Sequence, residues 1–291
     1  MKIIKPVAID DTTLTSTTGI ETPPAEWASG TTYNSGEEVS TGTAGGIITV
    51  WESLQDSNTN NDPASSPTWW QELGTTYAEY AAGTTYATGD RVIVAAEHRE
   101  YESLQDSNTG NTPSENETFW QDIGATNAWR TFDKKVGSVS SRYQSLQYVI
   151  DAESLLAGVA LLNLEGAEVN IVMDDPIDGE VYNETVDLIS TENVFDGYTY
   201  CFEPFLLLPN VVKTDLPPYI SATVTISITG GEQVECGEIV TGKILSLGDS
   251  QHGVERGILD FSRKTRDTFG NFDILERVYS ARTNVRVVMP K

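Results

Sequence analysis

The chain has 291 residues, enough for two or three domains, of which 38% are apolar and 21% charged, and its formal net charge is −25. This charge argues against nucleic acid or an anionic membrane as a partner, because both require a surplus of Lys and Arg. The abundance of Thr, Ser, Gly, Asn, Val and Ile favours strands and turns, so we expect an all-β protein.

The first 24 residues are expected to form an N-terminal arm. The stretch Met1–Ile20 carries lysines at positions 2 and 5 but no apolar core of the kind found in secretory signal peptides. The longest apolar run, Leu155–Leu164, is about half the length of a membrane span. We therefore expect neither a signal peptide nor membrane insertion.

An octapeptide, ESLQDSNT, occurs twice, at Glu52–Thr59 and Glu102–Thr109, each time directly after a large aromatic residue. It lies within a longer repeat that begins with GTTYxxG and ends with an aromatic pair followed by Q[ED][LI]G. The first copy has three extra residues in the Gly-rich hairpin Thr41–Thr49, where added loop length costs little. The repeat predicts two tandem modules, residues 25–77 and 78–128, with strands, polar turns and aromatic cores.

An aromatic pair closes each module, Trp69–Trp70 in the first and Phe119–Trp120 in the second. Adjacent side chains of an extended segment point in opposite directions, so we expect Trp70 and Trp120 inside and their neighbours at the surface. Surface aromatic rings can stack on sugar rings through their apolar faces. The alternative is packing against a neighbouring module or domain. The candidates for carbohydrate contact are Tyr33, Trp69, Tyr86 and Phe119.

The aromatic, glycine and proline positions of both repeats, such as Tyr86-x2-Gly89-Asp90-x-Val92, resemble the chitin- and cellulose-binding modules of bacterial chitinases (families 5 and 12). The resemblance covers about residues 25–125 and implies compact, three-stranded, all-β modules. Those modules usually carry their sugar-stacking aromatics where this chain has ESLQDSNT. No aromatic occurs in Glu52–Pro67 or Glu102–Thr118, so the family's binding platform does not transfer to this chain.

Residues 129–291 contain short strand patterns separated by turns, for example the alternating stretch Ala222–Thr229, without amphipathic helices. This pattern predicts an antiparallel β-sandwich or jelly roll. Cys201 and Cys236 lie outside any C-x-x-C pair, and we expect both to be buried as small apolar residues.

Charge is distributed unevenly along the chain. Residues 1–128 contain four basic and 19 acidic residues, whereas residues 256–291 contain eight basic and four acidic residues. The basic segment is a candidate for docking against an acidic neighbour, and the alternative is that its charges pair internally, for instance with Asp260 and Asp267. The docking candidates are Arg256, Arg263, Arg266 and Arg277.

Catalytic and metal-binding patterns are weak in this sequence. The run DSNTNND, Asp56–Asp62, starts like a calcium loop but lacks the closing glutamate, so we favour a hydrogen-bonded turn. Asp174 and Asp175 could be a glycosidase pair only if the fold placed them suitably, and His98 and His252 are expected at the surface. We expect no cofactor, no metal and no enzymatic activity.

Four segments resemble a group of bacteriophage and prophage virion proteins: Met1–Asp11, Gly124–Asp133, Gly237–Gly248 and Asp260–Arg277. The resemblance implies a structural component of the phage tail tip, baseplate or tail fibre, made in the host cytoplasm and located in the virion. It also implies other tail proteins as partners and a homo-oligomer in a symmetric assembly. In this arrangement the chain assembles through its β-sandwich and presents the two modules. The alternatives are a receptor-binding protein for host-surface polysaccharide and a polysaccharide-degrading enzyme with appended modules.

Overall fold

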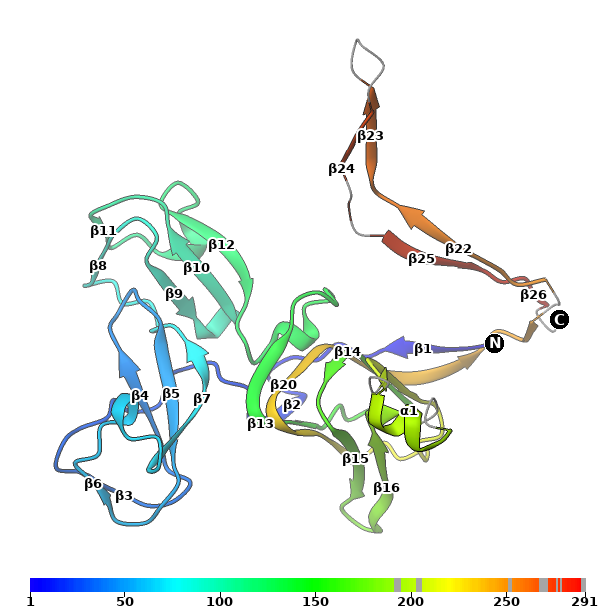
Figure 1. Cartoon of the computed structure of the whole chain (residues 1–291), viewed down its shortest axis with the longest axis horizontal. Coiled ribbons are helices and arrows are strands. Elements are labelled where there is room, and N and C mark those ends of the chain that lie inside the picture. The colour runs from blue at the N-terminus through cyan, green and yellow to red at the C-terminus, as the bar shows by residue number, and fades with distance from the viewer. Residues whose placement is uncertain are drawn as a thin grey trace. The chain divides into compact units, whose positions relative to one another are not determined.

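The computed structural model describes residues 1–190, 195–202, 206–250, 253–266, 272–275, 277 and 279–288. These residues form many antiparallel strands, one short helix, α1 (Gly197–Phe202), and a few 3-10 turns, which confirms the all-β prediction (Figure 1). The chain falls into two compact units, one of Pro6–Lys243 and the other of Met1–Lys5 with Ile244–Lys291.

Each repeat folds into a three-stranded antiparallel sheet and a two-stranded one, as expected for tandem modules. The first module contains the sheet β4 (Glu38–Gly42), β5 (Ile48–Ser53) and β7 (Trp70–Thr76), the pair β3 (Thr32–Tyr33) and β6 (Asn58–Thr59), and the turn η1 (Pro63–Ser65). The second contains the sheet β9 (Arg91–Val94), β10 (Arg99–Ser103) and β12 (Trp120–Ala125), the pair β8 (Thr85–Tyr86) and β11 (Asn108–Thr109), and the turns η2 (Ala95–Glu97) and η3 (Pro113–Glu115).

The two module cores are built differently. The second module buries Tyr86, Val92, Tyr101 and Trp120 together, all from within its own repeat. The first module relies on Ile20, which precedes the repeat and packs with Val50 and Leu73. The first module is therefore completed by the N-terminal segment.

Among the described residues, a larger antiparallel sheet contains eight strands. Its strands follow η4 (Arg130–Phe132) in the chain, apart from two that come from the N-terminal segment. They are β1 (Lys2–Pro6), β2 (Leu14–Thr17), β13 (Ser140–Ile150), β14 (Gly158–Glu165), β15 (Glu168–Asp175), β16 (Gly179–Asp187), β19 (Asn210–Lys213) and β20 (Thr223–Ser246).

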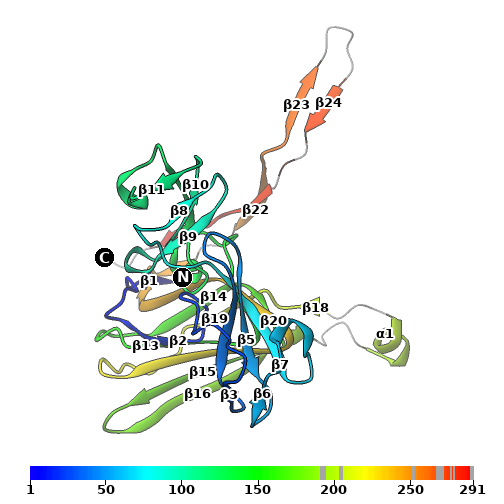
Figure 2. The same cartoon turned by 90° about the vertical axis from the view of Figure 1, so that its left-hand side faces the viewer.

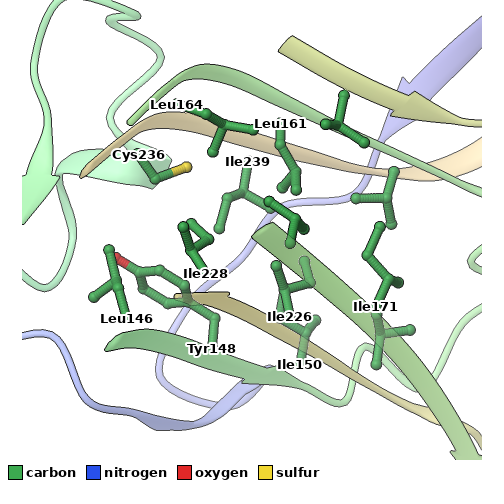
Figure 3. Packing of buried hydrophobic residues seen from close by; sticks show 14 of the residues in the cluster. Leu146, Tyr148, Ile150, Leu161, Leu164, Ile171, Ile226, Ile228, Cys236 and Ile239 are labelled. Atoms are coloured by element: carbon green, nitrogen blue, oxygen red, sulfur yellow. The ribbon is translucent and has the colours of Figure 1, made fainter. Parts of the chain in front are cut away.

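The long strand β20 organises this sheet. Its first part pairs with β15 and its second part with β14, while β13 runs along both parts. The register of β13 shifts at Gln144, which has a φ of 62°, opposite the Gly230–Gly231 region of β20. Side chains of both parts, such as Ile226 and Cys236, enter one core (Figure 3). The sheet is thus folded over a single core, in agreement with the predicted sandwich.

The C-terminal residues form a two-stranded antiparallel ribbon. Three successive strand pairs, formed by described residues between 249 and 288, make up this C-terminal ribbon. The strands of the pair 263–266 with 272–275 are labelled in Figure 2. The pairs are β21 (Asp249–Ser250) with β26 (Val287–Val288), β22 (Glu255–Asp260) with β25 (Tyr279–Asn284), and β23 (Arg263–Arg266) with β24 (Phe272–Leu275). A separate short pair, β17 (Ile189–Ser190) and β18 (Leu206–Leu207), flanks α1 in the chain.

Candidate ligand face of the two modules

The polar side chains of the first octapeptide form an internal hydrogen-bond network. The Asn58 amide, which is 1% exposed, donates to Ser53 Oγ at 3.0 Å and to the Trp69 carbonyl at 3.3 Å. Asn61 donates to Asn58 Oδ1 at 2.8 Å, and the Gln55 amide donates to the Thr68 carbonyl at 2.8 Å. These bonds tie the turn after β5 to the start of β7.

The second octapeptide repeats this network bond by bond. The Asn108 amide donates to Ser103 Oγ at 3.1 Å, and Asn111 donates to Asn108 Oδ1 at 2.8 Å. The Gln105 amide donates to the Thr118 carbonyl at 2.8 Å. In both modules several polar groups of the octapeptide are thus used inside the fold, which leaves fewer of them for a ligand.

The two octapeptide aspartates also hold turns. Asp56 Oδ1 accepts the Ser35 N–H at 3.0 Å, and Asp106 Oδ1 accepts the Thr88 N–H at 2.9 Å. The hydrogen bonds from Thr88 lower the pKa of Asp106. In the run that resembled a calcium loop, Asp62 caps η1 by accepting the Ala64 N–H at 2.9 Å. These contacts fit the turn interpretation of DSNTNND.

The two residues of each closing aromatic pair differ in burial. Trp70 and Trp120 are each 2% exposed, and Trp69 and Phe119 beside them are half-buried, so the inward placement of the two tryptophans is confirmed. The Nε1 groups of both buried tryptophans donate at 2.8 Å to backbone carbonyls at the ends of the polar turns.

Tyr86 is 2% exposed and its hydroxyl accepts the Ala81 N–H at 2.9 Å. Its ring meets Trp120 edge-on at 5.2 Å. A ring buried in this way cannot offer a face to a sugar, so Tyr86 is corrected to a core residue. Tyr33 is half-buried, accepts the Ala28 N–H at 3.0 Å and meets Trp70 edge-on at 5.3 Å.

Each module also exposes a leucine that the sequence analysis did not single out. Leu54 is 44% exposed and Leu104 is 42% exposed. Their backbone N–H groups donate to the carbonyls of Trp69 and Phe119, both at 2.9 Å. We define the module face as Leu54 with Trp69 in the first module and Leu104 with Phe119 in the second. Strand alternation could have indicated these exposed leucines, because each follows a serine whose side chain points inward.

His98 lies half-buried at a junction, where the sequence predicted a surface residue. Its ring stacks on Trp129 at 3.9 Å, with Nε2 2.7 Å from Asp11 Oδ1 and Nδ1 3.0 Å from Glu21 Oε1. One imidazole of the second module thus contacts the N-terminal segment and Trp129. Trp129 lies at the start of the large domain, residues 129 onward, which contains most strands of the eight-stranded sheet. The reason that sequence could not show this is that the three partners are far apart along the chain.

A second junction contact is the ion pair between Arg130 and the buried Glu100, at 2.9 Å. Burial raises the pKa of Glu100, and the neighbouring guanidinium of Arg130 opposes this change. Both side chains line a cavity of about 620 Å³. The charges of Glu100 and Arg130 thus offset each other inside this cavity, whose lining also includes Asp133 and Lys135.

Among the predicted docking residues, Arg256, Arg263 and Arg277 are exposed on the C-terminal ribbon. The backbone of Arg266 lies in β23, and its side chain lies outside the described part of the structure, as do His252 and Asp267. Cys236 is buried as predicted, whereas Cys201 is exposed on α1, where a short helix leaves its side chain uncovered.

Comparison with known proteins identifies no matching family model and no matching curated protein. The lectin domain of lectinolysin complexed with Lewis B antigen is 14% identical, over 40% of this chain and 83% of that chain, with a TM-score of 0.28. A fucose-binding module of Streptococcus pneumoniae, SpX-3, is 18% identical, over 40% of this chain and 84% of that chain, also with a TM-score of 0.28. Similarity at this level carries no argument about function.

Within the described ranges, no helix is long and apolar enough to cross a membrane.

Proposed function

We propose that the chain is a structural subunit of a phage tail that presents two carbohydrate-binding modules. The observation that carries the sugar-binding part is the module face, an exposed leucine beside a half-buried aromatic ring, repeated at equivalent positions of both modules. Because it occurs twice, a ligand with repeating units, such as a polysaccharide, could contact both modules and gain from multivalency.

The chemistry of this face suits sugars. Phe119 packs partly against the core of its module, and the uncovered part of its ring, like that of Trp69, offers an apolar surface against which the C–H groups of a pyranose can stack. The polar groups around it, such as Asn58 and Asn108, are already bonded within the protein. Recognition would therefore rest on stacking and shape, with weak binding to each module.

The structural role in a virion rests on different support. Four segments across the chain resemble phage and prophage virion proteins, and described residues of the C-terminal ribbon, such as Ile258 and Phe261, expose apolar side chains. Two-stranded ribbons are marginally stable alone in water, so an assembled partner would stabilise it. The gene neighbourhood tests this part, since we expect tail genes on both sides.

Sugar binding is tested by pull-down on insoluble chitin and on immobilised host lipopolysaccharide. We expect the intact chain to bind one of the two, and the double variant Trp69→Ala, Phe119→Ala to lose binding. Ile47→Ala is the matched control, because Ile47 is 62% exposed but lies outside the module face. Equal retention of the double variant and the control would remove these two residues from the proposal. Absence of binding by the intact chain to either material would overturn the sugar-binding part.

A further inference from the structure

The C-terminal ribbon exposes apolar side chains along its described length. All six residues of β22 are exposed, which leaves both Ile258 and Leu259 in solvent although they point to opposite faces of the ribbon. The exposed large apolar residues are Val254 at 54%, Ile258 at 67%, Leu259 at 44%, Phe261 at 56%, Leu275 at 54% and Val288 at 50%. Such a row on a two-stranded ribbon is typical of a surface that another protein covers.

Positive charge is concentrated in the chain from Arg256 onward, whereas residues 249–288 as a whole have seven basic and six acidic residues. Residues 256–291 have a net charge of +4. Because the whole chain has a net charge of −25, the preceding 255 residues have a net charge of −29. Among the described residues, no acidic group forms an ion pair with the guanidinium groups of Arg256, Arg263, Arg277, Arg282 or Arg286. The expected partner surface is therefore acidic, with exposed apolar side chains.

The chain itself carries a surface of this kind on the β15–β16 hairpin. Residues 174–187 contain six acidic residues and no basic residue. In the described part of the structure, Glu184 is the member of this group that forms an ion pair, with Lys213. At the hairpin turn Ile177 is 88% exposed, and the turn is held by Asp175, whose Oδ1 accepts the Ile177 N–H at 2.9 Å.

The position of β16 adds a third property. It ends the strand order of the large sheet, so that one of its backbone edges is not used by the sheet. Exposed edges of this kind pair readily with strands of another chain. Acidic side chains along β16, including Glu180 and Asp187, would repel most acidic surfaces of this protein and favour a basic strand.

We propose that the C-terminal ribbon of one copy docks on the acidic β15–β16 hairpin of a second copy. Each chain supplies both complementary surfaces, and each surface has a strongly exposed apolar side chain, Ile177 at 88% and Ile258 at 67%. Contact between two different surfaces of the chain gives head-to-tail association, which closes into a ring or extends into a filament. This inference rests on the proposed structural role and is independent of sugar binding.

Two charge reversals test the contact. Arg256→Glu with Arg282→Glu changes exposed residues on β22 and β25, and Glu180→Lys with Asp187→Lys changes exposed residues of the hairpin. We expect the intact chain to form oligomers at low salt, measured by light scattering after gel filtration, and to dissociate as salt rises. We expect each variant alone to be a monomer.

Mixing provides the decisive measurement. The hairpin variant keeps an intact ribbon and the ribbon variant keeps an intact hairpin, so an equimolar mixture should form a heteromer. Lys134→Glu with Lys135→Glu is the matched control for the ribbon variant, because these exposed residues lie outside both surfaces and the change in net charge equals that of the ribbon variant. The control should oligomerise like the intact chain.

Three outcomes would overturn the proposal: an intact chain that is monomeric at low salt, a ribbon variant with unchanged mass, or a mixture that stays monomeric although both variants are folded by circular dichroism. Retention on chitin or lipopolysaccharide, measured with the same variants, separates this failure from failure of sugar binding. We expect every charge variant to retain the sugar binding of the intact chain, because no substitution touches the module face.

Discussion

Asn58 and Asn108 lie at the centre of the duplicated polar turns, where each amide both donates and accepts within the fold. These networks act as a polar core for modules that have few apolar residues to bury. A buried amide that loses its partners is costly, so the two asparagines should be less tolerant of substitution than the exposed polar residues around them.

Substitution of Asn108 tests this role. We expect Asn108→Ala to lower the free energy of unfolding by about 1–3 kcal/mol, because Ser103 and Asn111 lose a partner in a buried site. Urea denaturation of the chain, followed by tryptophan fluorescence, measures the change. Ser114→Ala, at an exposed position of the same module, should have little effect. Equal stability of the two variants would contradict a structural role for the network.

Asp175 gives the large domain a predictable response to acid. The Ser221 hydroxyl, followed by the backbone N–H groups of Asp178 and Ile177, lowers the pKa of Asp175. A lowered pKa in the folded state means that this carboxylate stabilises the protein above its ordinary pKa, and that the contribution is lost as pH falls through the folded value. We expect Asp175→Asn to reduce the acid dependence of unfolding, measured by urea titration below pH ~5. Asp174→Asn, at the exposed neighbouring position, should not.

The two cysteines should differ in reactivity. Burial raises the pKa of the Cys236 thiol to about 12, whereas Cys201 is exposed. Because the thiolate is the reactive species, we expect Ellman's reagent to modify Cys201 rapidly in the native protein and Cys236 after unfolding. Two rapidly reacting thiols per native chain would contradict the burial of Cys236.

Sequence reasoning reached some of these residues and missed others for physical reasons. Alternation along an extended segment placed Trp70 and Trp120 correctly, because that rule depends on local geometry. Tyr86 was misplaced because its strand has two residues, too short for alternation to fix a direction, and packing against Trp120 decided the outcome. Contacts such as those of His98 depend on tertiary structure and have no local signal.

At the scale of elements, the modules have the same strands but different requirements. The core residues of the second module lie in residues 86–120, whereas Ile20 contributes to the core of the first. The repeat therefore predicted the strands of both modules, and it could not predict a core residue that comes from outside the repeat unit.

Fragments make this difference measurable. We expect residues 78–128 to melt cooperatively alone, because their core is complete. A fragment of residues 25–77 should melt broadly or at lower temperature, and residues 19–77 should restore a cooperative transition by returning Ile20. Identical melting of the two first-module fragments, followed by circular dichroism, would contradict a role for Ile20.

At the scale of the whole molecule, the large domain does not depend on the ribbon for its core. The buried residues of that core lie between Leu14 and Ile239. A chain that lacks Arg256–Lys291 should therefore keep the melting midpoint of the remainder, measured by calorimetry.

The same truncation should abolish incorporation into phage particles, measured by immunoblot of purified particles. Normal incorporation would contradict a docking role for the ribbon.

The long strand β20 also sets the order in which the chain can fold during synthesis. Both modules are complete once residue 125 has left the ribosome, so they can fold early. Strands β13, β14 and β15 must wait until residues 223–246 emerge, because all three pair with β20. During this interval their apolar faces lack the central strand of their sheet, and the nascent chain has the greatest need of a chaperone. A ribosome stalled shortly before residue 223 would therefore hold two folded modules and an unfinished sandwich.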